Sequence, residues 1–379
     1  MKPNSISRGL NAARREVEIR WRVSGFLTPS ANDRLSNAEF DRARSICSDI
    51  RAIISARTGY IDENGLDTEF CFPGANWEGD WEENPLYRGT VALLREDYEV
   101  INNLRLFSQV FSGYSLLEMK DARGLLVPDH VPLDLTERLI RVSRRTDDWV
   151  RRYWVLSRCV PGFLHLSQPN RFGEAGWIYS GRIVNHDTCV YMERVALLHA
   201  SGLLNRLGAT THNPLILEIG GGFGGLAYHL KRLVPQARYI IIDIPESLVF
   251  SAIYLTTLFP DQHNVMATSP ELMIKFLDRP GFTFIPNHFC HRFEDAGKCV
   301  DLAINTLSMS EMLAGQVAAY CELVRNCLRP EGVFFEQNED NRHLGLLNAE
   351  LQVGAFFKHR RQISLPTYLV SGSPNIWSQ

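Results

Sequence analysis

Five glycines that follow a short apolar run are the residues of this sequence best placed to hold a ligand. The run at 215–217 ends at Glu218, and the glycines that come next are Gly220, Gly221, Gly222, Gly224 and Gly225. Glycine adopts backbone angles that other residues avoid and has no Cβ, so a ligand can lie directly against this turn. A helical pattern begins near Gly224, and its first free N–H groups would favour a carboxylate or a phosphate there.

A second carboxylate closes the next predicted strand. Residues 239–242 form an apolar run that is typical of a buried parallel strand, and Asp243 ends it. A carboxylate at this place can accept hydrogen bonds from the hydroxyls of a ribose. The stretch 215–243 therefore predicts a strand, a tight turn, a helix and a second strand that together bind a nucleotide cofactor.

Two cofactor classes fit this unit. Gly220, Gly222 and Gly225 have the G-x-G-x-x-G spacing of a dinucleotide site, in which a pyrophosphate lies at the helix N-terminus. Glu218 favours another cofactor, because a negative charge beside the glycines gains nothing from a pyrophosphate. A glycine-rich turn that binds no ligand is a third interpretation.

The turn and the strand after it carry a family resemblance. The order Glu218, Gly220, Gly222, Gly224 resembles motif I of class I S-adenosylmethionine (SAM)-dependent methyltransferases, and IIIDIPESL at 240–248 resembles their second motif. The resemblance implies that Glu218 acts through the amino-acid end of SAM and that Asp243 binds its ribose. It also implies that the element before the first strand covers the methionine end. The further candidates for the cofactor site are His186, Asp187, Tyr191, Ile244 and Asn287.

Composition describes a globular protein of two domains. The chain has 379 residues, of which 45% are hydrophobic and 22% charged, and its formal net charge is −3. At roughly 150 residues per domain, this length suggests two domains. The charge balance disfavours a nucleic-acid partner, and no apolar run suits a membrane helix or a signal peptide, so we expect a cytoplasmic protein. The eight cysteines include no C-x-x-C pair and are expected to be reduced, buried thiols.

The first 180 residues predict a mainly helical cap, or substrate domain. Helical spacing is present at 8–22, 40–54, 91–119 and 138–158, and the last of these is rich in arginine. Glycines and Pro169 in 161–185 mark the expected boundary, which assigns residues 1–180 to the cap and 181–379 to the SAM-binding domain.

An acidic stretch at 61–90 interrupts the helical pattern. Glycine, proline and asparagine break its periodicity, which predicts a long loop that contains Trp77, Trp81 and Tyr87. Aromatic faces among carboxylates can stack on a sugar, so the loop could be an acceptor lid. The alternative is that the tryptophans only anchor the loop to the surface.

After Asp243, helical and strand patterns alternate. Helices are expected at 246–259 and 313–328, and strands at 282–285, 300–304 and 332–336, which predicts a doubly wound parallel α/β sheet. The resemblance adds an antiparallel edge pair, which we place at the apolar runs 355–357 and 368–370. The fold class is therefore a Rossmann-like methyltransferase sheet with a helical N-terminal domain.

Polar residues follow the carboxyl ends of these strands, where ligands bind in such sheets. Glu311 and His288 are the candidate proton acceptors, with His291 as a further candidate, and Asn305 and Asn338 are candidate positioning partners. Glu311 could also join an oxygen site for Mg²⁺ with Glu336, Glu339 and Asp340, although no ligand spacing compels a metal.

Four segments narrow the resemblance. EIGGGFGGLA, IDIPESL with the SAIYLTTLFP that follows it, INTLSMSEM and FFEQN are similar in order and spacing to the bacterial sugar O-methyltransferase family of natural-product and glycan pathways. This implies transfer of a methyl group from SAM to a hydroxyl of a sugar or a glycosylated small molecule. A homodimer is compatible with the sequence. An NAD-dependent oxidoreductase and a degenerate methyltransferase-like scaffold are the alternative functions.

Overall fold

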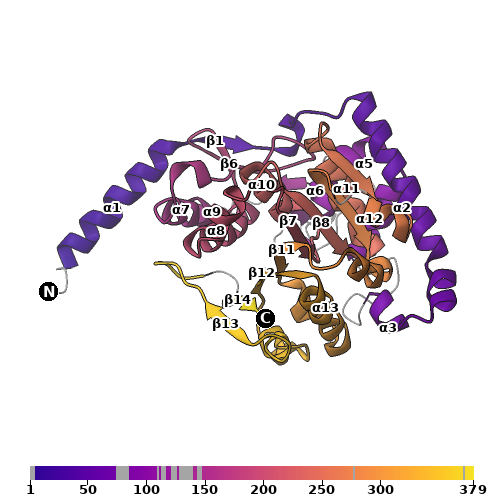
Figure 1. The fold of residues 1–379 in the computed structure, drawn as a ribbon. Helices are drawn as coiled ribbons and strands as arrows, with labels where there is room; N and C mark the ends of the chain where they lie inside the picture. The colour runs from indigo at the N-terminus through magenta and orange to yellow at the C-terminus, as the bar shows by residue number, and fades with distance from the viewer. Residues whose placement is uncertain are drawn as a thin grey trace.

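A mixed eight-stranded sheet forms the centre of the fold (Figure 1). The structure, a computed structural model, describes residues 5–73, 85–108, 111, 117–120, 126–127, 140–142, 147–275, 278–369 and 372–379. The strands of the large sheet are β7 (Leu215–Ile219), β8 (Arg238–Asp243), β9 (His263–Met266), β10 (Gly281–Pro286), β11 (Val300–Thr306), β12 (Leu328–Gln337), β13 (His359–Gln362) and β14 (Pro374–Ser378). Their order across the sheet is β13-β14-β12-β11-β7-β8-β10-β9.

Six neighbouring strands, from β9 to β12 across the sheet, pair in parallel, and helices cover both faces. Side chains alternate between the faces, as strand geometry requires. Ile216 and Ile241 pack with α8 (His186–Ala200), α10 (Gly225–Leu233) and α11 (Pro245–Leu258). Leu217 and Ile240 pack with α13 (Ala314–Cys327) and α14 (Ala349–Gly354) on the other face. The predicted doubly wound α/β fold is confirmed.

The antiparallel edge pair exists, but its predicted position is wrong. β13 pairs with β14, and β14 pairs with β12, both antiparallel. All four residues of β13 are exposed, so this strand has no apolar run to reveal it. The apolar run at 355–357 instead ends in Phe357, which is buried beside Trp377. The edge strand β9 also escaped prediction, because its residues are only half-buried.

The N-terminal region is mainly helical, as predicted, and carries two small sheets. Its helices are α1 (Ser5–Arg22), α2 (Asn37–Asn64), α3 (Thr68–Cys71), α4 (Pro85–Leu94), α5 (Tyr98–Asn102), α6 (Leu104–Phe107) and α7 (Asp147–Leu156). The strands are β1 (Val23–Leu27), β5 (Gly176–Tyr179) and β6 (Arg182–Val184) in one sheet, and β2 (Leu117–Lys120), β3 (Leu126–Val127) and β4 (Ile140–Val142) in the other. Figure 1 shows α1 extending away from the body, whereas α2 lies along it.

Three expectations for this region are corrected. Residues 61–90 are not one long loop, because α2 continues to Asn64, where the left-handed Gly65 ends it. The short helix α3 lies within the stretch, and α4 begins in it. Residues 91–119 divide into parts of three short helices and the start of β2. Residues 138–158 begin with β4 and become helical only in α7. At 91–119 and 138–158, apolar spacing that suits a helix also suits short helices and strands joined by turns.

The expected boundary at residue 180 lies inside a hairpin. β5 pairs with β6 across it, with Trp177 opposite Val184, and β1 pairs with the other edge of β5. The connecting helices α9 (Leu203–Gly208) and α12 (Pro270–Lys275) complete the α-helices. Of the helices that the structure describes, none has the length and apolar character needed to cross a membrane.

Candidate cofactor and acceptor site

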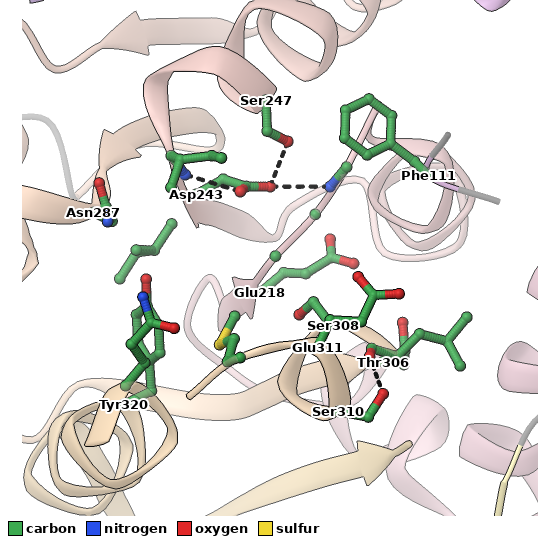
Figure 2. A pocket seen from close by; sticks show the side chains of 18 of the residues that line it. Phe111, Glu218, Asp243, Ser247, Asn287, Thr306, Ser308, Ser310, Glu311 and Tyr320 are labelled. Atoms are coloured by element: carbon green, nitrogen blue, oxygen red, sulfur yellow. Dashed lines mark hydrogen bonds between the residues drawn. The ribbon is translucent and has the colours of Figure 1, made fainter. Parts of the chain in front are cut away.

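A cavity of about 360 Å³ opens at the carboxyl ends of β7, β8, β10 and β11. This is the edge at which ligands bind in parallel sheets, because loops from neighbouring strands converge there. The polar and charged residues that line it are Tyr191, Arg194, Glu218, Asp243, Ser247, Asn287, Thr306, Ser308, Ser310, Glu311, Gln316, Tyr320, Glu339 and Asn341. Figure 2 shows many of them, with Asn287 and Tyr320 at one end and Glu311 with Thr306 at the other.

The glycine turn follows β7 and forms one wall. Gly220, Gly222 and Gly224 all have positive φ, at 69°, 54° and 87°. Neighbouring side chains of the same chain leave little room for a Cβ at these positions. A Cβ at Gly220 would overlap Ser308, and one at Gly222 would lie 3.1 Å from Cβ of Phe111. Gly220, Gly221 and Gly222 line the cavity, whereas Gly224 lies outside its lining, starts α10 and packs on Leu255.

Asp243 is held by three donors at the end of β8. Its Oδ2 accepts from Ser247 Oγ at 2.8 Å and from the Gly222 backbone at 3.2 Å, and its Oδ1 accepts from the Ile244 backbone at 2.8 Å (Figure 2). Burial raises the pKa of Asp243 to about 6, although these hydrogen bonds oppose the rise. The carboxylate is thus fixed in direction on the cavity wall. Ile244, also predicted, lines the cavity beside it.

Glu218, the last but one residue of β7, is a buried acid beside the turn. Its Oε2 accepts a hydrogen bond of 2.8 Å from the Tyr239 hydroxyl. Burial raises the pKa of Glu218 to about 7, against that hydrogen bond and the charge of Arg194. Tyr191 lines the same part of the cavity, and its ring packs against Gly225 at the start of α10.

Arg194 lines the cavity and was not predicted from the sequence. It is 4% exposed, and its Nε and Nη2 have no hydrogen-bond partner among the described residues. Its guanidinium lies 5.6 Å from the centre of the Tyr191 ring, one helical turn earlier on α8. An arginine beside Glu193 in a largely apolar helical run was the available signal. Buried guanidinium nitrogens without hydrogen-bond partners are costly, so this side chain is suited to receive an anionic group in addition to the nearby carboxylates of Glu218 and Glu193.

Asn287 lines the opposite end of the cavity, at the start of the 3₁₀ helix η6 (Asn287–Ala296). Its Nδ2 donates to the Phe70 carbonyl at 3.0 Å, and its buried Oδ1 has no partner among the described residues. The Tyr320 side chain lies near Asn287 in Figure 2. This end therefore offers one free acceptor between aromatic walls.

Glu311 lies on the 3₁₀ helix η7 (Ser308–Glu311), which follows β11 and lines the cavity. Burial, with a further contribution from the nearby Glu339, raises the pKa of Glu311 to about 7. Asn305 and Asn338 accept hydrogen bonds from the backbone of this helix and do not line the cavity. Asn338 donates to Asn305 Oδ1 at 2.9 Å, and its own Oδ1 accepts from the Ser310 backbone at 3.3 Å.

The predicted histidines lie outside the cavity lining. His288 is 1% exposed, its ring packs on Tyr60 and Phe289, and burial lowers its pKa to about 4. His291 is 3.5 Å from the Tyr60 hydroxyl on the same side. His186 contacts Trp149 and Asp187, and Asp187 is bound by Arg105.

Residues of the expected lid do reach the cavity. Phe70, Phe72, Pro73 and Leu86, all from 61–90, line it, and so does Phe111. Trp77 and Trp81 lie outside the described residues. Apolar and aromatic side chains from the N-terminal region thus cover a site whose charged groups come from the C-terminal half.

The four candidate metal ligands are not brought together. Glu336 is buried beside Asn338 and Asn375, and Asp340 pairs with Arg342 in a surface turn. Glu311 and Glu339 line the cavity. Within the described parts of the chain, no group of three or more histidine, cysteine, aspartate or glutamate side chains is placed to hold a metal ion.

No protein-family model and no curated protein matches the chain. Among solved structures, the precorrin-6y C5,15-methyltransferase of Geobacter metallireducens GS-15 matches with 12% identity and a TM-score of 0.32, over 47% of this chain and 86% of that one. The magnesium protoporphyrin IX methyltransferase of Synechocystis PCC 6803, with bound SAM, matches with 11% identity and a TM-score of 0.30, over 50% of this chain and 84% of that one. Similarity at this level does not decide a ligand.

Proposed function

We propose that this protein is a SAM-dependent methyltransferase. The charge pattern of the cavity is the observation that carries the proposal. Arg194 is the only lysine, arginine or histidine among the described lining residues, which include the carboxylates of Glu218, Asp243, Glu311 and Glu339. SAM carries a sulfonium, an ammonium and a single carboxylate. A cavity with one guanidinium among several carboxylates complements that charge distribution.

Each end of the proposed cofactor has a matching group. Arg194 would bind the carboxylate of the methionine moiety, and Glu218 would act on its amino end. Asp243 would accept from the ribose hydroxyls, and the free Oδ1 of Asn287 would accept from the amino group of adenine. Gly220, Gly221, Gly222 and Ile244 would form the wall between these groups.

Among the described residues, the start of α10 offers no comparable site for the pyrophosphate of NAD. Such a group would need the first N–H groups of α10, but the Tyr191 ring packs against Gly225 there. The charged residue of β7 is Glu218, whose carboxylate would repel a pyrophosphate. These features favour SAM over the oxidoreductase alternative.

We further propose that the acceptor is a hydroxyl of a sugar or a glycosylated small molecule, in a natural-product or glycan pathway. When bound, SAM supplies a methyl group that is already activated, so the chain has to align the acceptor and remove its proton. Glu311 would take that proton. Ser310, Thr306 and Asn341 line the cavity nearby and offer hydrogen bonds to further hydroxyls. Phe70 and Phe72 would pack on the apolar faces of the acceptor.

In this proposal, residues 1–180 contribute the cover over the acceptor, and residues 181–379 bind SAM. Mg²⁺ is not needed, because Glu311 alone can serve as the base.

Product analysis tests the proposal. Purified protein is incubated with SAM and a panel of sugars and glycosides, and S-adenosylhomocysteine and products heavier by one methylene group are measured by mass spectrometry. The expected result is enzyme-dependent S-adenosylhomocysteine together with a methylated acceptor. If NAD, and not SAM, is bound and reduced with one of these acceptors, the protein is an oxidoreductase. Binding of SAM without turnover on any acceptor would favour the scaffold alternative.

A further inference from the structure

We infer that Arg105 is a positioning residue for the cofactor turn, which it holds through the ring of Phe223. The inference rests on the proposed function, since it takes SAM as the ligand. Arg105 lies on α6 in the N-terminal region and does not line the cavity, whereas Phe223 lies between Gly222 and Gly224 and does. The proposed effect on the cofactor is therefore indirect.

Arg105 is fixed on every side by buried partners. It is 0% exposed, and its Nε donates to Glu174 Oε2 at 2.9 Å. Its Nη2 donates to Asp187 Oδ2 at 2.5 Å, and its Nη1 donates to Ser108 Oγ at 2.6 Å. Because all three nitrogens are engaged, the plane of the guanidinium cannot turn without breaking a buried ion pair.

The ring of Phe223 packs against the guanidinium of Arg105. The Cζ atom of Arg105 lies 3.8 Å from the ring centre, and the ring is 1% exposed. Tyr191 and Tyr254 meet it edge to face, at 6.1 Å and 5.4 Å between ring centres. A cation over an aromatic face attracts it more strongly when water is excluded, as it is here.

The turn needs such an anchor because of its composition. Gly222 and Gly224, on either side of Phe223, both have left-handed backbone angles, and glycine leaves other angles open to them as well. Phe223 supplies the side chain that pins the segment between these glycines. Fixing the turn before the cofactor arrives reduces the ordering cost of binding. Loss of Arg105 should therefore weaken SAM binding, although Arg105 itself does not line the cavity.

A double-mutant cycle with a matched control tests the inference. SAM affinity is measured by calorimetry for the wild type, Arg105→Lys, Phe223→Leu and the double variant, and melting temperature is recorded for each. The control is Arg152→Lys. Arg152 is also buried, pairs with Glu193, and lies 4.2 Å from the centre of the Tyr368 ring, but it is outside the cavity lining.

We expect Arg105→Lys and Phe223→Leu each to weaken SAM binding on the order of tenfold. The SAM affinity of the double variant should be about the same as that of either single variant. Turnover of Arg105→Lys at saturating SAM should stay near wild type, because Arg105 does not line the cavity. Arg152→Lys should lower the melting temperature to a similar degree, while its SAM affinity stays within about twofold of wild type.

Several results would overturn the inference. Affinity of Arg105→Lys within about twofold of wild type would do so, and so would effects of the two changes that multiply in the double variant. If Arg105→Lys does not fold, Phe223→Leu alone decides, and unchanged SAM affinity in it refutes the role of the ring. A wild type that does not bind SAM at all would instead overturn the proposed function, and this inference with it.

Discussion

Arg194 is a buried cation with two guanidinium nitrogens that can still donate to a ligand's carboxylate. Its Nε and Nη2 lack partners among the described residues, and burial lowers its pKa. Burying guanidinium nitrogens without hydrogen bonds costs folding free energy, and a cofactor carboxylate would recover that cost on binding. The residue should therefore weaken the free protein and strengthen the complex.

Arg194→Met should separate these two effects. SAM affinity should fall on the order of a hundredfold or more, because a buried charged hydrogen bond is lost. The free protein should melt at the same temperature as wild type or higher. Calorimetry and thermal unfolding check both. Arg194→Lys, which keeps the charge, is the control and should retain part of the affinity; a lower melting temperature for Arg194→Met with unchanged SAM binding would contradict this role.

The cavity acids predict how SAM binding depends on pH. Burial raises the pKa of Glu218 from 4.5 to about 7 and that of Asp243 from 3.8 to about 6. The ionised forms accept more strongly from the cofactor's amino group and ribose than the protonated forms do, so affinity should rise as pH increases from about 5.5 to 7.5, with proton release on binding. Calorimetry in buffers of different ionisation enthalpy measures this; an affinity that is flat over this range would argue against both contacts.

The same shifts affect the free protein in the opposite sense. The folded state holds the Glu218 proton more tightly than the unfolded state does. Its contribution to the free energy of unfolding is therefore complete below the unfolded pKa of 4.5 and is lost as pH rises through about 7. Free protein should become less stable over the range in which SAM binding becomes tighter.

Glu311→Gln tests the proposed base. It keeps the shape of the side chain and removes the proton acceptor, so kcat should fall on the order of a hundredfold or more while SAM affinity is retained. The wild-type kcat should rise with pH to a plateau above the Glu311 pKa of about 7. Glu339→Gln is the matched control: it should shift the rise to lower pH and keep most of the plateau rate. Near-normal turnover of Glu311→Gln would exclude it as the base.

Single residues differed in how well the sequence predicted them. Glu218 and Asp243 were recognisable because each ends an apolar run beside a turn, and the structure places both on the cavity wall. Arg194 was missed because its importance depends on having no partner, which only the fold reveals. His288 was singled out by its type, but its ring is buried against Tyr60, outside the cavity lining.

At the scale of elements, the turn after β7 depends on its own packing as much as on a ligand. Gly222→Val would place a branched side chain at a φ of 54° and against Phe111. We expect SAM binding to fall below detection in calorimetry, while the circular dichroism spectrum stays native and the melting temperature drops. The control is Gly208→Ala, since a Cβ there meets nothing within 4 Å. Normal SAM binding by Gly222→Val would mean that the turn is not part of the cofactor site.

The helix η7 is also under local constraint. Leu307, just before it, has a φ of 70°, which is uncommon for a residue with a side chain, and its backbone N–H donates to the Gln337 carbonyl at 3.0 Å. Ser308 and Asn305 tie the helix to the end of β7. Such a conformation persists when surrounding contacts determine it, and here they direct Glu311 toward the cavity.

Elements buried on both faces were predictable, and exposed ones were not. The central strands appear in the sequence as predominantly apolar runs because helices cover them on both sides. β13 carries only exposed polar residues, so nothing in its composition separates it from a loop. In the N-terminal region, the apolar positions at 91–119 are shared among short elements that turn at Asp97 and Asn103, which local periodicity alone does not show.

At the scale of the whole molecule, buried arginines join the N-terminal region to the elements around the cavity. Arg57 on α2 binds both carboxylate oxygens of Glu246, at 3.1 Å and 2.7 Å, in the first turn of α11. Its guanidinium also lies 4.4 Å from the centre of the Phe72 ring, which lines the cavity. Long-range pairs of this kind cannot be read from sequence patterns, because their partners are far apart in the chain.

The most direct test of the account is a calorimetric titration of the wild type at about pH 7.5, above the pKa of both cofactor acids. SAM, S-adenosylhomocysteine, NAD and NADP are titrated in turn, and Arg194→Met is titrated with SAM alongside. The account predicts saturable binding of SAM and S-adenosylhomocysteine at a single site, a large loss in Arg194→Met, and no binding of either dinucleotide. Binding of NAD or NADP without binding of SAM would contradict it.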